Sequence, residues 1–341
     1  MSKRGNYSKM VKSIKSRVKD FLYAIFEITT SPEAIYVFKR FVISLFTIFA
    51  VITITFFVMH AVPGGPFQAE KALTAEAEEI LREKYGLDKP LLVQYATYLK
   101  DILFKFDFGP SLTQRGRGVI EIIRDGLSTS VKLGLSAAFI AVIAGITLGA
   151  FAAIKRNSVT DRVIMIFTTT FVSMPSFIMG TLLLMTFSLS LGWFPAVASS
   201  DMGIRGLVLP VITLSLYPTA YITRLTRSSM LETLNQDYIR TAKAKGSSRL
   251  SIIFKHSLKN SLIPVITYFG PLIANIVTGS LVVEKIFAVP GIGRDFINSI
   301  VNRDYPLIMA TTIILSILVV FMNFLSDMLY RLVDPRISLS I

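Results

Sequence analysis

The sequence predicts an all-α integral membrane protein with six transmembrane helices and a small extracytoplasmic helical cap. Its 341 residues are 52% apolar and only 17% charged, with a mean hydropathy of +0.60. Long stretches carry no charged residue at all, and the basic residues gather in alternate segments between those stretches. Buried helices of a soluble protein are usually shorter and keep a polar stripe, so composition and run length favour the membrane.

The first uncharged run, Phe41–Pro63, is long enough to cross a bilayer, for which roughly 20 apolar residues suffice. Comparable runs recur along the chain. The expected spans are 41–63, 131–154, 163–190, 206–223, 263–283 and 307–328. They separate an N-terminal extension (1–40), the cap (64–130), a long loop (224–262), a second outer loop (284–306) and a tail (329–341).

The formal net charge of +14 is spread unevenly, and this predicts the orientation. Residues 1–40 hold nine Lys and Arg against three acids, and residues 223–262 hold eight against Glu232 and Asp237. If the spans alternate, every basic segment lies on the cytoplasmic side, together with both termini. A basic protein can also bind nucleic acid, but these charges lie beside membrane spans, which argues against that reading.

The N-terminal extension contains apolar residues at helical spacing between lysines and arginines over residues 8–26. This pattern is typical of an amphipathic helix on an anionic membrane surface, and the alternative is a solvated tail. In the cap, a helix is expected from Thr74 to Tyr85, ended by Gly86, and another from Lys89-Pro90 to Gly109-Pro110. A cap of this size is too small to be an enzyme domain.

Small residues and prolines mark the spans. Gly145 and Gly149 form a small-xxx-small pair, which permits close packing either within the chain or against a partner subunit. Prolines are expected to interrupt three spans: Pro175 in the third, Pro210 and Pro218 in the fourth, and Pro264 and Pro271 in the fifth. Carbonyls freed at membrane depth must face protein or water, so broken spans favour a transport path over a passive anchor. The spans hold no acidic or histidine relay and no arginine ladder.

The long loop predicts two helices joined at a glycine. Asp237–Lys245 is helical in composition, and Gly246 suits a left-handed residue after a helix end. Ser247 or Ser248 can then cap a second helix over 249–262. Several apolar residues lie in this loop and are expected to enter a groove of another protein: Ala242, Ala244, Ile252, Ile253, Phe254 and Leu258.

Further short motifs occur in order along the chain. They are Ala61-Val62-Pro63-Gly64-Gly65-Pro66, Tyr85-Gly86-Leu87-Asp88-Lys89-Pro90, Asp107-Phe108-Gly109-Pro110-Ser111, Met174-Pro175-Ser176-Phe177, Asp237–Gly246, Val283-Glu284-Lys285-Ile286-Phe287 with Pro290-Gly291-Ile292-Gly293, Arg303-Asp304-Tyr305-Pro306 and Asp334-Pro335-Arg336. With these motifs, residues 40–338 resemble the first (B-type) permease subunit of oligopeptide/dipeptide ABC importers, in the peptide/nickel family. The resemblance implies the type I ABC importer permease fold and a bacterial cytoplasmic membrane location.

Permeases of this kind carry an EAA-type loop that docks into an ATPase subunit. Here Arg240-Thr241-Ala242 stands at the Glu-Ala-Ala positions, Gly246 is retained, and Leu258-Lys259 replaces an expected Leu-Pro. The resemblance implies that ten residues couple this chain to the ATPase: Asp237, Tyr238, Arg240, Thr241, Ala242, Lys243, Ala244, Lys245, Gly246 and Ser247. Outer loop or gate candidates are Glu284, Lys285, Pro290, Gly291 and Gly293, although Glu284 and Lys285 can equally form an interfacial ion pair.

The sequence contains no G-x-x-x-x-G-K-[ST] phosphate-binding loop, no metal-binding signature and no catalytic pair. We therefore expect no catalytic residue, metal site or cofactor in this chain, with ATP and Mg2+ on partner ATPase subunits. The expected partners are a second homologous permease subunit, two cytoplasmic ATPases, an extracytoplasmic peptide-binding protein and membrane lipid. The expected cargo is oligopeptides; dipeptides, nickel or metal chelates are alternatives, and a self-sufficient carrier or channel is a competing class.

Overall fold

The computed structural model describes residues 32–62, 86–114, 116–198 and 203–333. By its internal contacts the chain divides into two compact units, one up to Ala50 and one from Val51 onward. Helix α2 (Pro32–Ala61) begins in the first unit and ends in the second. The amphipathic helix expected at 8–26 and the cap helix expected at 74–85 lie outside the described residues.

Four helices within the described ranges are long and apolar enough to cross a membrane: α2, α5 (Val119–Ile154), α8 (Gly203–Leu234) and α14 (Tyr305–Val333). The spans expected at 41–63, 131–154, 206–223 and 307–328 fall on these four helices in chain order. Helix α8 continues to Leu234, so Arg224–Leu234 belongs to it rather than to a separate loop. Among the four, α8 is the most enclosed by the rest of the chain. In its most apolar 18-residue stretch 61% of the residues are buried, against 28% in that of α14.

The expected third span is a broken helix. Helix α6 (Val159–Ser173) and the following α7 (Ser176–Leu183), which continues as the π-helical segment η1 (Leu184–Ser190), meet at a bend of 108°. Pro175 stands at the break as the N-cap of α7, where its missing N–H costs no helical hydrogen bond. The interruption expected at Pro175 is therefore present, and the pair is a fifth candidate span.

Not every proline breaks its helix. Pro210 and Pro218 lie inside a continuous α8, and Pro271 lies inside a continuous α12 (Ile263–Ile286), while Pro264 stands in the first turn of α12. The expectation that these residues interrupt their spans was wrong. Neighbouring helices cover α8, where both prolines are buried, and such packing can hold a helix together across the lost hydrogen bond.

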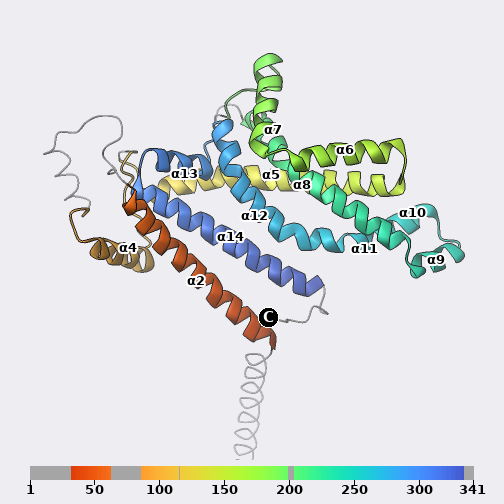
Figure 1. Ribbon diagram of the computed structural model, residues 1–341, viewed down its shortest axis with the longest axis horizontal. Helices are drawn as coiled ribbons and strands as arrows, with labels where there is room; N and C mark the ends of the chain where they lie inside the picture. The colour runs from red at the N-terminus through yellow and green to blue at the C-terminus, as the bar shows by residue number, and fades with distance from the viewer. Residues whose placement is uncertain (1–31, 63–85, 115, 199–202, 334–341) are drawn as a thin grey trace, which may run out of the picture. The chain divides into compact units, whose positions relative to one another are not determined.

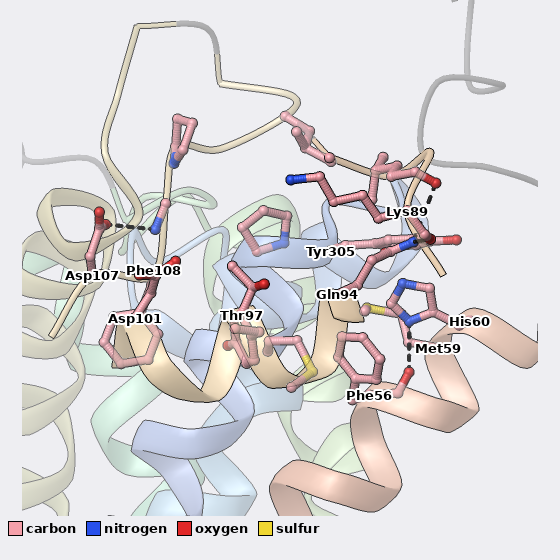
Figure 2. A pocket seen from close by; sticks show the side chains of 18 residues that line it. Phe56, Met59, His60, Lys89, Gln94, Thr97, Asp101, Asp107, Phe108 and Tyr305 are labelled. Atoms are coloured by element: carbon pink, nitrogen blue, oxygen red, sulfur yellow. Dashed lines mark hydrogen bonds between the residues drawn. The ribbon is translucent and has the colours of Figure 1, made fainter. Parts of the chain in front are cut away.

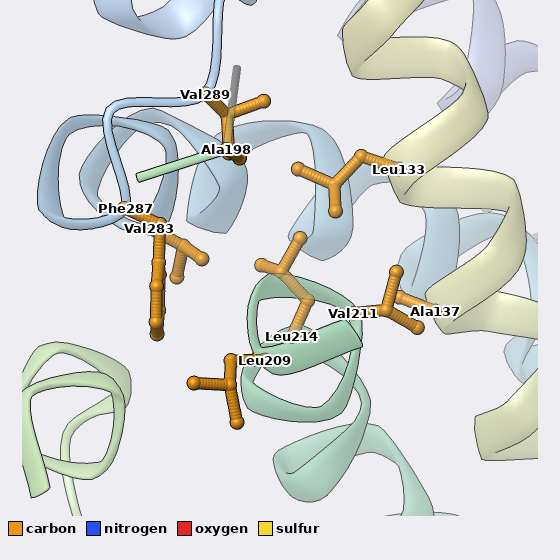
Figure 3. Close-up of a cluster of buried hydrophobic side chains, with 9 residues drawn as sticks. All are labelled: Leu133, Ala137, Ala198, Leu209, Val211, Leu214, Val283, Phe287 and Val289. Atoms are coloured by element: carbon orange, nitrogen blue, oxygen red, sulfur yellow. The ribbon is translucent and has the colours of Figure 1, made fainter. Parts of the chain in front are cut away.

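Close packing of α5 against α8 is set by two glycines. A Cβ on Gly145 would lie 2.7 Å from the Ile222 side chain, and one on Gly149 would lie 2.6 Å from the Thr223 carbonyl oxygen. The small-xxx-small pair therefore serves packing within the chain, the first of the two readings above. Figure 3 shows the apolar cluster beyond this contact, where α5 supplies Leu133 and Ala137, α8 supplies Leu209, Val211 and Leu214, and the α12 end supplies Val283 and Phe287.

Apolar side chains also face outward from the helices. Phe139 on α5 is 68% exposed and Ile166 on α6 is 66% exposed, and both helices are rich in apolar residues. A water-soluble protein does not present such faces, whereas hydrocarbon tails cover them without cost. The helical fold, the long apolar helices and these outward faces together make the chain a multi-pass membrane protein.

In the described part of the cap, α4 (Leu91–Lys105) begins after Pro90 as expected. It ends earlier than expected, because Phe106 adopts a left-handed conformation (φ 53°) and its N–H bonds back to the Ile102 carbonyl. The sequence signal at Gly109-Pro110 instead marks the loop that follows, where Pro110 bridges to Gly118 just before α5. Helix α13 (Ile292–Val301) follows α12 and precedes α14 in the chain, and it packs beside the start of α5 (Figure 1).

Candidate functional site

The loop after α8 contains the two helices and the glycine turn that the sequence predicts. Helix α9 (Asp237–Ala244) ends at Lys245, and Gly246 follows with φ +79°. The Gly246 N–H donates to the Lys243 carbonyl at 3.0 Å, and the Ser247 N–H donates to the Ala242 carbonyl at 3.1 Å. Nothing lies within 4 Å of a Cβ built on Gly246, so its left-handed backbone, and not lack of space, demands glycine.

The second helix is capped by Ser248, whose Oγ accepts from the Ser251 N–H at 3.3 Å. It runs through α10 (Arg249–Ser251), a π-helical segment η3 (Ile252–Leu258) and α11 (Lys259–Ser261) before α12 begins. The helix expected over 249–262 is therefore present from Arg249 to Ser261, widened in its middle, and Leu262 forms a turn before α12. Such π segments occur frequently at functional sites.

The loop is fixed to its own spans by apolar residues. Ile239 of α9 is fully buried, and Ile252 and Ile253 of η3 are 7% exposed. Ile253 packs with Met230 of α8 and Ala153 of α5, with Leu258 beside them. The expectation that Ile252, Ile253 and Leu258 enter another protein was wrong, because these residues anchor the loop to this chain.

The same loop also carries large exposed side chains. Tyr238 is 42% exposed, Leu250 is 68% exposed and Phe254 is 62% exposed. We name Tyr238, Leu250 and Phe254 the loop tip. The Tyr238 hydroxyl accepts from the Asn260 amide at 2.9 Å, which ties α9 to α11 across the Gly246 turn. The tip thus stands on a fixed base, and it is the apolar part of the loop that remains available to a partner.

Most of the ten predicted coupling residues lie at the surface around this tip. Ala242 and Ser247 are half-buried, and the other eight are exposed. Asp237 and Arg240 form an ion pair with 3.5 Å between Oδ1 and Nη1, and both side chains are almost fully in solvent. Such a pair contributes little to stability. The structure gathers these residues on one short element, and their part in coupling stays a prediction.

A buried ion pair lies between α8 and the start of α6. Arg227 Nε and Nη2 donate to the two Asp161 oxygens at 2.7 and 2.8 Å, and the Asn157 N–H donates to Oδ2 at 2.9 Å. The Asp161 side chain is only 5% exposed. Sequence reasoning counted both residues only as loop charges. The structure places Arg227 on the same face of α8 as Thr223 and Met230, both fully buried, and the sequence alone does not show this burial.

In the last turn of α12, the predicted gate residue Glu284 is fully buried. Its oxygens accept from Ser130 Oγ at 2.7 Å, from the Gly293 N–H at 2.8 Å and from the Arg294 N–H at 3.2 Å. A carboxylate among the first N–H groups of a helix is stabilised by those donors and by the helix dipole. Glu284 therefore holds the start of α13 against α5.

Two of the other gate candidates, Gly291 and Gly293, lie against this carboxylate. Gly293 approaches so closely that its Cβ would lie 2.8 Å from Glu284 Oε2, and Gly291 approaches closer still, while Pro290 is exposed. Lys285 does not pair with Glu284: its Nζ donates to Asn298 Oδ1 at 2.5 Å. The ion-pair reading was wrong, because successive residues of a helix point in different directions. A gate role for these residues stays a prediction.

A third buried carboxylate, Asp304, joins two motifs that lie far apart in the sequence. Asp304 is fully buried before α14 and accepts from the Leu112 N–H at 3.1 Å, from Thr113 Oγ1 at 2.8 Å and from Ser111 Oγ. It also accepts from the Leu307 N–H in the first turn of α14 at 3.4 Å. The cap loop around Ser111 is thereby fastened to the start of α14.

No group of three or more His, Asp or Glu side chains that could hold a metal ion occurs in the part of the chain that the structure describes. The functional features there are one fixed loop with an exposed apolar tip and three carboxylates that join helices.

Comparison of the sequence with known proteins shows which family the chain belongs to. Residues 145–339 match the model of the binding-protein-dependent transport system inner membrane component, and residues 34–116 match that of the corresponding N-terminal component. The dipeptide transport system permease protein DppB of Bacillus subtilis is 47% identical over 304 residues, which cover 89% of this chain and 98% of that protein. The oligopeptide transport system permease protein OppB of Haemophilus influenzae is 42% identical over 302 residues, with the same coverage of each chain.

Solved structures agree on the fold. A chain of the MetNI methionine ABC transporter, in an inward-facing conformation, superposes with a TM-score of 0.53 at 18% identity, over 63% of this chain and 97% of that one. A chain of an amino acid ABC transporter superposes with a TM-score of 0.50 at 16% identity, over 62% and 94%. At these identities the likeness shows a shared permease fold and nothing more.

Proposed function

This chain belongs to the inner membrane components of binding-protein-dependent transport systems, and we propose that it is a permease subunit that imports oligopeptides across the bacterial cytoplasmic membrane. Support for peptide cargo comes from relatives at 40–47% identity that are named dipeptide or oligopeptide permeases. The segment Pro63-Gly64-Gly65-Pro66-Phe67 resembles the oligopeptide members of the family more than the Gly-Asp-Pro form common in dipeptide and nickel permeases, and this resemblance is our reason for proposing oligopeptides. Both termini and the loop after α8 then face the cytoplasm, as the positive-inside rule expects.

The observation that carries this proposal is the loop tip on its fixed base. Ile253 holds the loop to α5 and α8, and Ile239 and Ile252 are buried as well, while Leu250 and Phe254 are exposed. A force applied to such a tip moves the helices, because the loop cannot yield independently of them. We therefore assign the tip to the contact with a cytoplasmic ATPase subunit, surrounded by the coupling residues from Asp237 to Ser247.

In this mechanism ATP and Mg2+ bind two partner ATPase subunits, and this chain contributes no catalytic residue. An extracytoplasmic binding protein delivers the peptide, and a second, homologous permease subunit completes the path across the membrane. Closure of the ATPases pulls the loop tip, and the packed helices switch between two arrangements that open to opposite sides. Peptide uptake therefore requires ATP, and the isolated chain transports nothing.

Site-specific photo-cross-linking tests the contact. Benzoylphenylalanine replaces Phe254 in the assembled complex, and we expect irradiation to join this chain to an ATPase subunit. Phe139 on α5 supplies the matched control, because it is an equally exposed phenylalanine on an apolar helix. The assignment fails if both positions cross-link the ATPase equally or if neither does.

Cargo is tested separately in proteoliposomes that contain the whole complex. We expect ATP-dependent uptake of a labelled tripeptide, inhibited more strongly by unlabelled tetrapeptides than by dipeptides or nickel. Uptake by this chain alone without ATP would instead support a self-sufficient carrier.

A further inference from the structure

An apolar stripe runs along the cap helix α4. Its members recur at the helical spacing i, i+4, i+7 and i+11: Leu92, Ala96, Leu99 and Leu103. We name these four residues the outer stripe. Leu92 at its start is 71% exposed and Leu103 at its end is 65% exposed. Contiguous exposed apolar surface marks a contact with a membrane or with another protein.

Polar residues of α4 are turned toward the chain itself. Figure 2 shows Gln94, Thr97 and Asp101 of α4 around a pocket of about 400 Å3, together with Met59 and His60 of α2. In a helix on the surface of a water-soluble protein, the polar side faces water and the apolar side faces the chain. Helix α4 instead turns polar residues inward and exposes the outer stripe. This arrangement favours hydrocarbon over water around the outer stripe.

The contact between α4 and α2 shows the depth at which α4 lies. The Tyr95 hydroxyl lies 2.6 Å from Thr53 Oγ1, and the ring centroids of Tyr95 and Phe56 are 5.2 Å apart. Thr53 belongs to the uncharged run Phe41–Pro63, and α2 continues past it to Ala61, about 12 Å farther along the helix axis. One tyrosine side chain does not span that distance. Helix α4 therefore lies beside the last turns of α2 and not beyond their end.

Helix α2 exposes apolar side chains next to these contacts. Ile54 follows Thr53 and is 62% exposed, and Val58 follows Phe57 and is 57% exposed. Both belong to the uncharged run that is long enough to cross the bilayer, where acyl chains cover such side chains. The surroundings of α4 at this depth are therefore hydrocarbon.

Two lysines stand at the edges of the apolar side of α4. Counted at about 100° per residue, Lys100 lies next to Ala96 and Lys105 lies next to Tyr98. Lys105 also pairs with Asp101 at 2.7 Å. Lysines at such edges bury their hydrocarbon stems and carry their charge to the headgroups.

We propose that the outer stripe of α4 lies in the membrane, covered by phospholipid acyl chains, with Lys100 and Lys105 at the headgroups. In the proposed orientation of the chain this is the outer leaflet. A soluble binding protein does not enter the hydrocarbon, so it does not account for the depth at which Tyr95 meets α2. The cap is then held at two points, by lipid at α4 and by Asp304 at the loop around Ser111. This contact goes beyond peptide import and does not depend on the cargo.

Site-directed spin labelling of the whole complex in nanodiscs tests the contact. The chain contains no cysteine, so Leu103→Cys carries a single nitroxide once the other subunits are made free of cysteine. Relaxation of the nitroxide is measured with oxygen, which concentrates in the bilayer, and with a water-soluble nickel chelate. We expect oxygen to relax the Leu103 label several-fold more strongly than the chelate does. Phe139→Cys, on the exposed apolar face of α5, provides the reference for a label in lipid.

Thr97→Cys is the matched control, because Thr97 is an exposed residue on the polar side of the same helix. The chelate should relax this label more strongly than oxygen does. Leu92→Cys provides a second position on the outer stripe and should behave as Leu103→Cys does. Both leucines are exposed, so neither substitution should change the melting temperature of the complex.

Two results would overturn the proposal. If the chelate relaxes the Leu92 and Leu103 labels as strongly as the Thr97 label, water covers the outer stripe. If neither oxygen nor the chelate reaches these labels, a protein surface covers it. Labels that the chelate reaches in the complex alone, and that become shielded when the binding protein is added, would also overturn the proposal and would identify that protein as the occupant.

Discussion

Buried carboxylates hold the helices together at two places, one near the loop after α8 and one near the cap. The carboxylates at these two places have different hydrogen-bond partners. At the loop end, Asp161 is paired with the cation of Arg227 in a bidentate contact. At the cap end, Asp304 and Glu284 are held by backbone N–H groups and hydroxyls. The first joint depends on one long side chain, and the other two spread their hydrogen bonds over several short groups. We infer that the loop end is the joint most easily broken by a single change.

The largest effect is expected at Arg227. Arg227→Met leaves Asp161 buried without its cation, which costs about 3–5 kcal/mol of stability. Thermal unfolding of the purified complex measures the loss. Asp161→Asn combined with Arg227→Met should recover a large part of it, because no buried charge then remains. Equal losses in the single and double variants would contradict the account.

A smaller loss is expected for Asp304→Ala, which leaves the Leu112 N–H and two hydroxyls near Asp304 without an acceptor. Each unpaired group costs about 1–3 kcal/mol, but the cap loop can shift and expose some of them to water. Asp304→Asn keeps one carbonyl oxygen and should lie between Ala and the wild type. Limited proteolysis of the loop around Ser111 should show faster cleavage in the same order, and unchanged cleavage in Asp304→Ala would refute the role of this joint.

Gly246 should affect coupling more than folding. Gly246→Val forces a β-branched residue into a left-handed conformation, which costs about 1–2 kcal/mol, so the turn is expected to open and displace the loop tip. ATP-dependent peptide uptake should fall sharply. Gly246→Asn is the matched control, since asparagine tolerates this conformation and should retain most of the uptake. Wild-type assembly and uptake in Gly246→Val would show that the turn is dispensable.

The smallest effect is expected for the exposed pair of Asp237 and Arg240. Asp237→Ala should change stability by less than about 0.5 kcal/mol, because solvent screens this pair. The same thermal unfolding assay used for Arg227→Met checks it. If Asp237→Ala lowered stability as much as Arg227→Met does, the claim that the buried ion pair matters more than the exposed one would be wrong.

Local features could be predicted from the sequence. The left-handed Gly246, the Ser248 cap and the break at Pro175 each follow from the properties of one residue type, and all three are present. The uncharged runs also predicted where the long helices lie, because a local stretch of sequence is enough to recognise a membrane-spanning helix. The prolines inside α8 show the limit, because burial by neighbouring helices decides whether a proline interrupts a span.

Partners distant in the sequence could not be predicted. The apolar pattern of Ile252 and Ile253 shows that one side of the loop is buried, but a pattern does not say whether this chain or another covers it. Glu284 and Lys285 are adjacent in sequence, yet Glu284 reaches Ser130 and the start of α13. The contact between Ser111 and Asp304 depends on how α14 meets the cap, and no local periodicity records it.

The most direct measurement compares ATP hydrolysis with peptide uptake in the Leu250→Asp, Phe254→Asp variant of the whole complex. Both residues are exposed, so we expect the variant to fold with a wild-type melting temperature. If the loop tip transmits the motion of the ATPases, uptake per ATP hydrolysed should fall at least tenfold. Wild-type uptake per ATP in a correctly assembled variant would contradict the claim that this loop couples the permease to its partner.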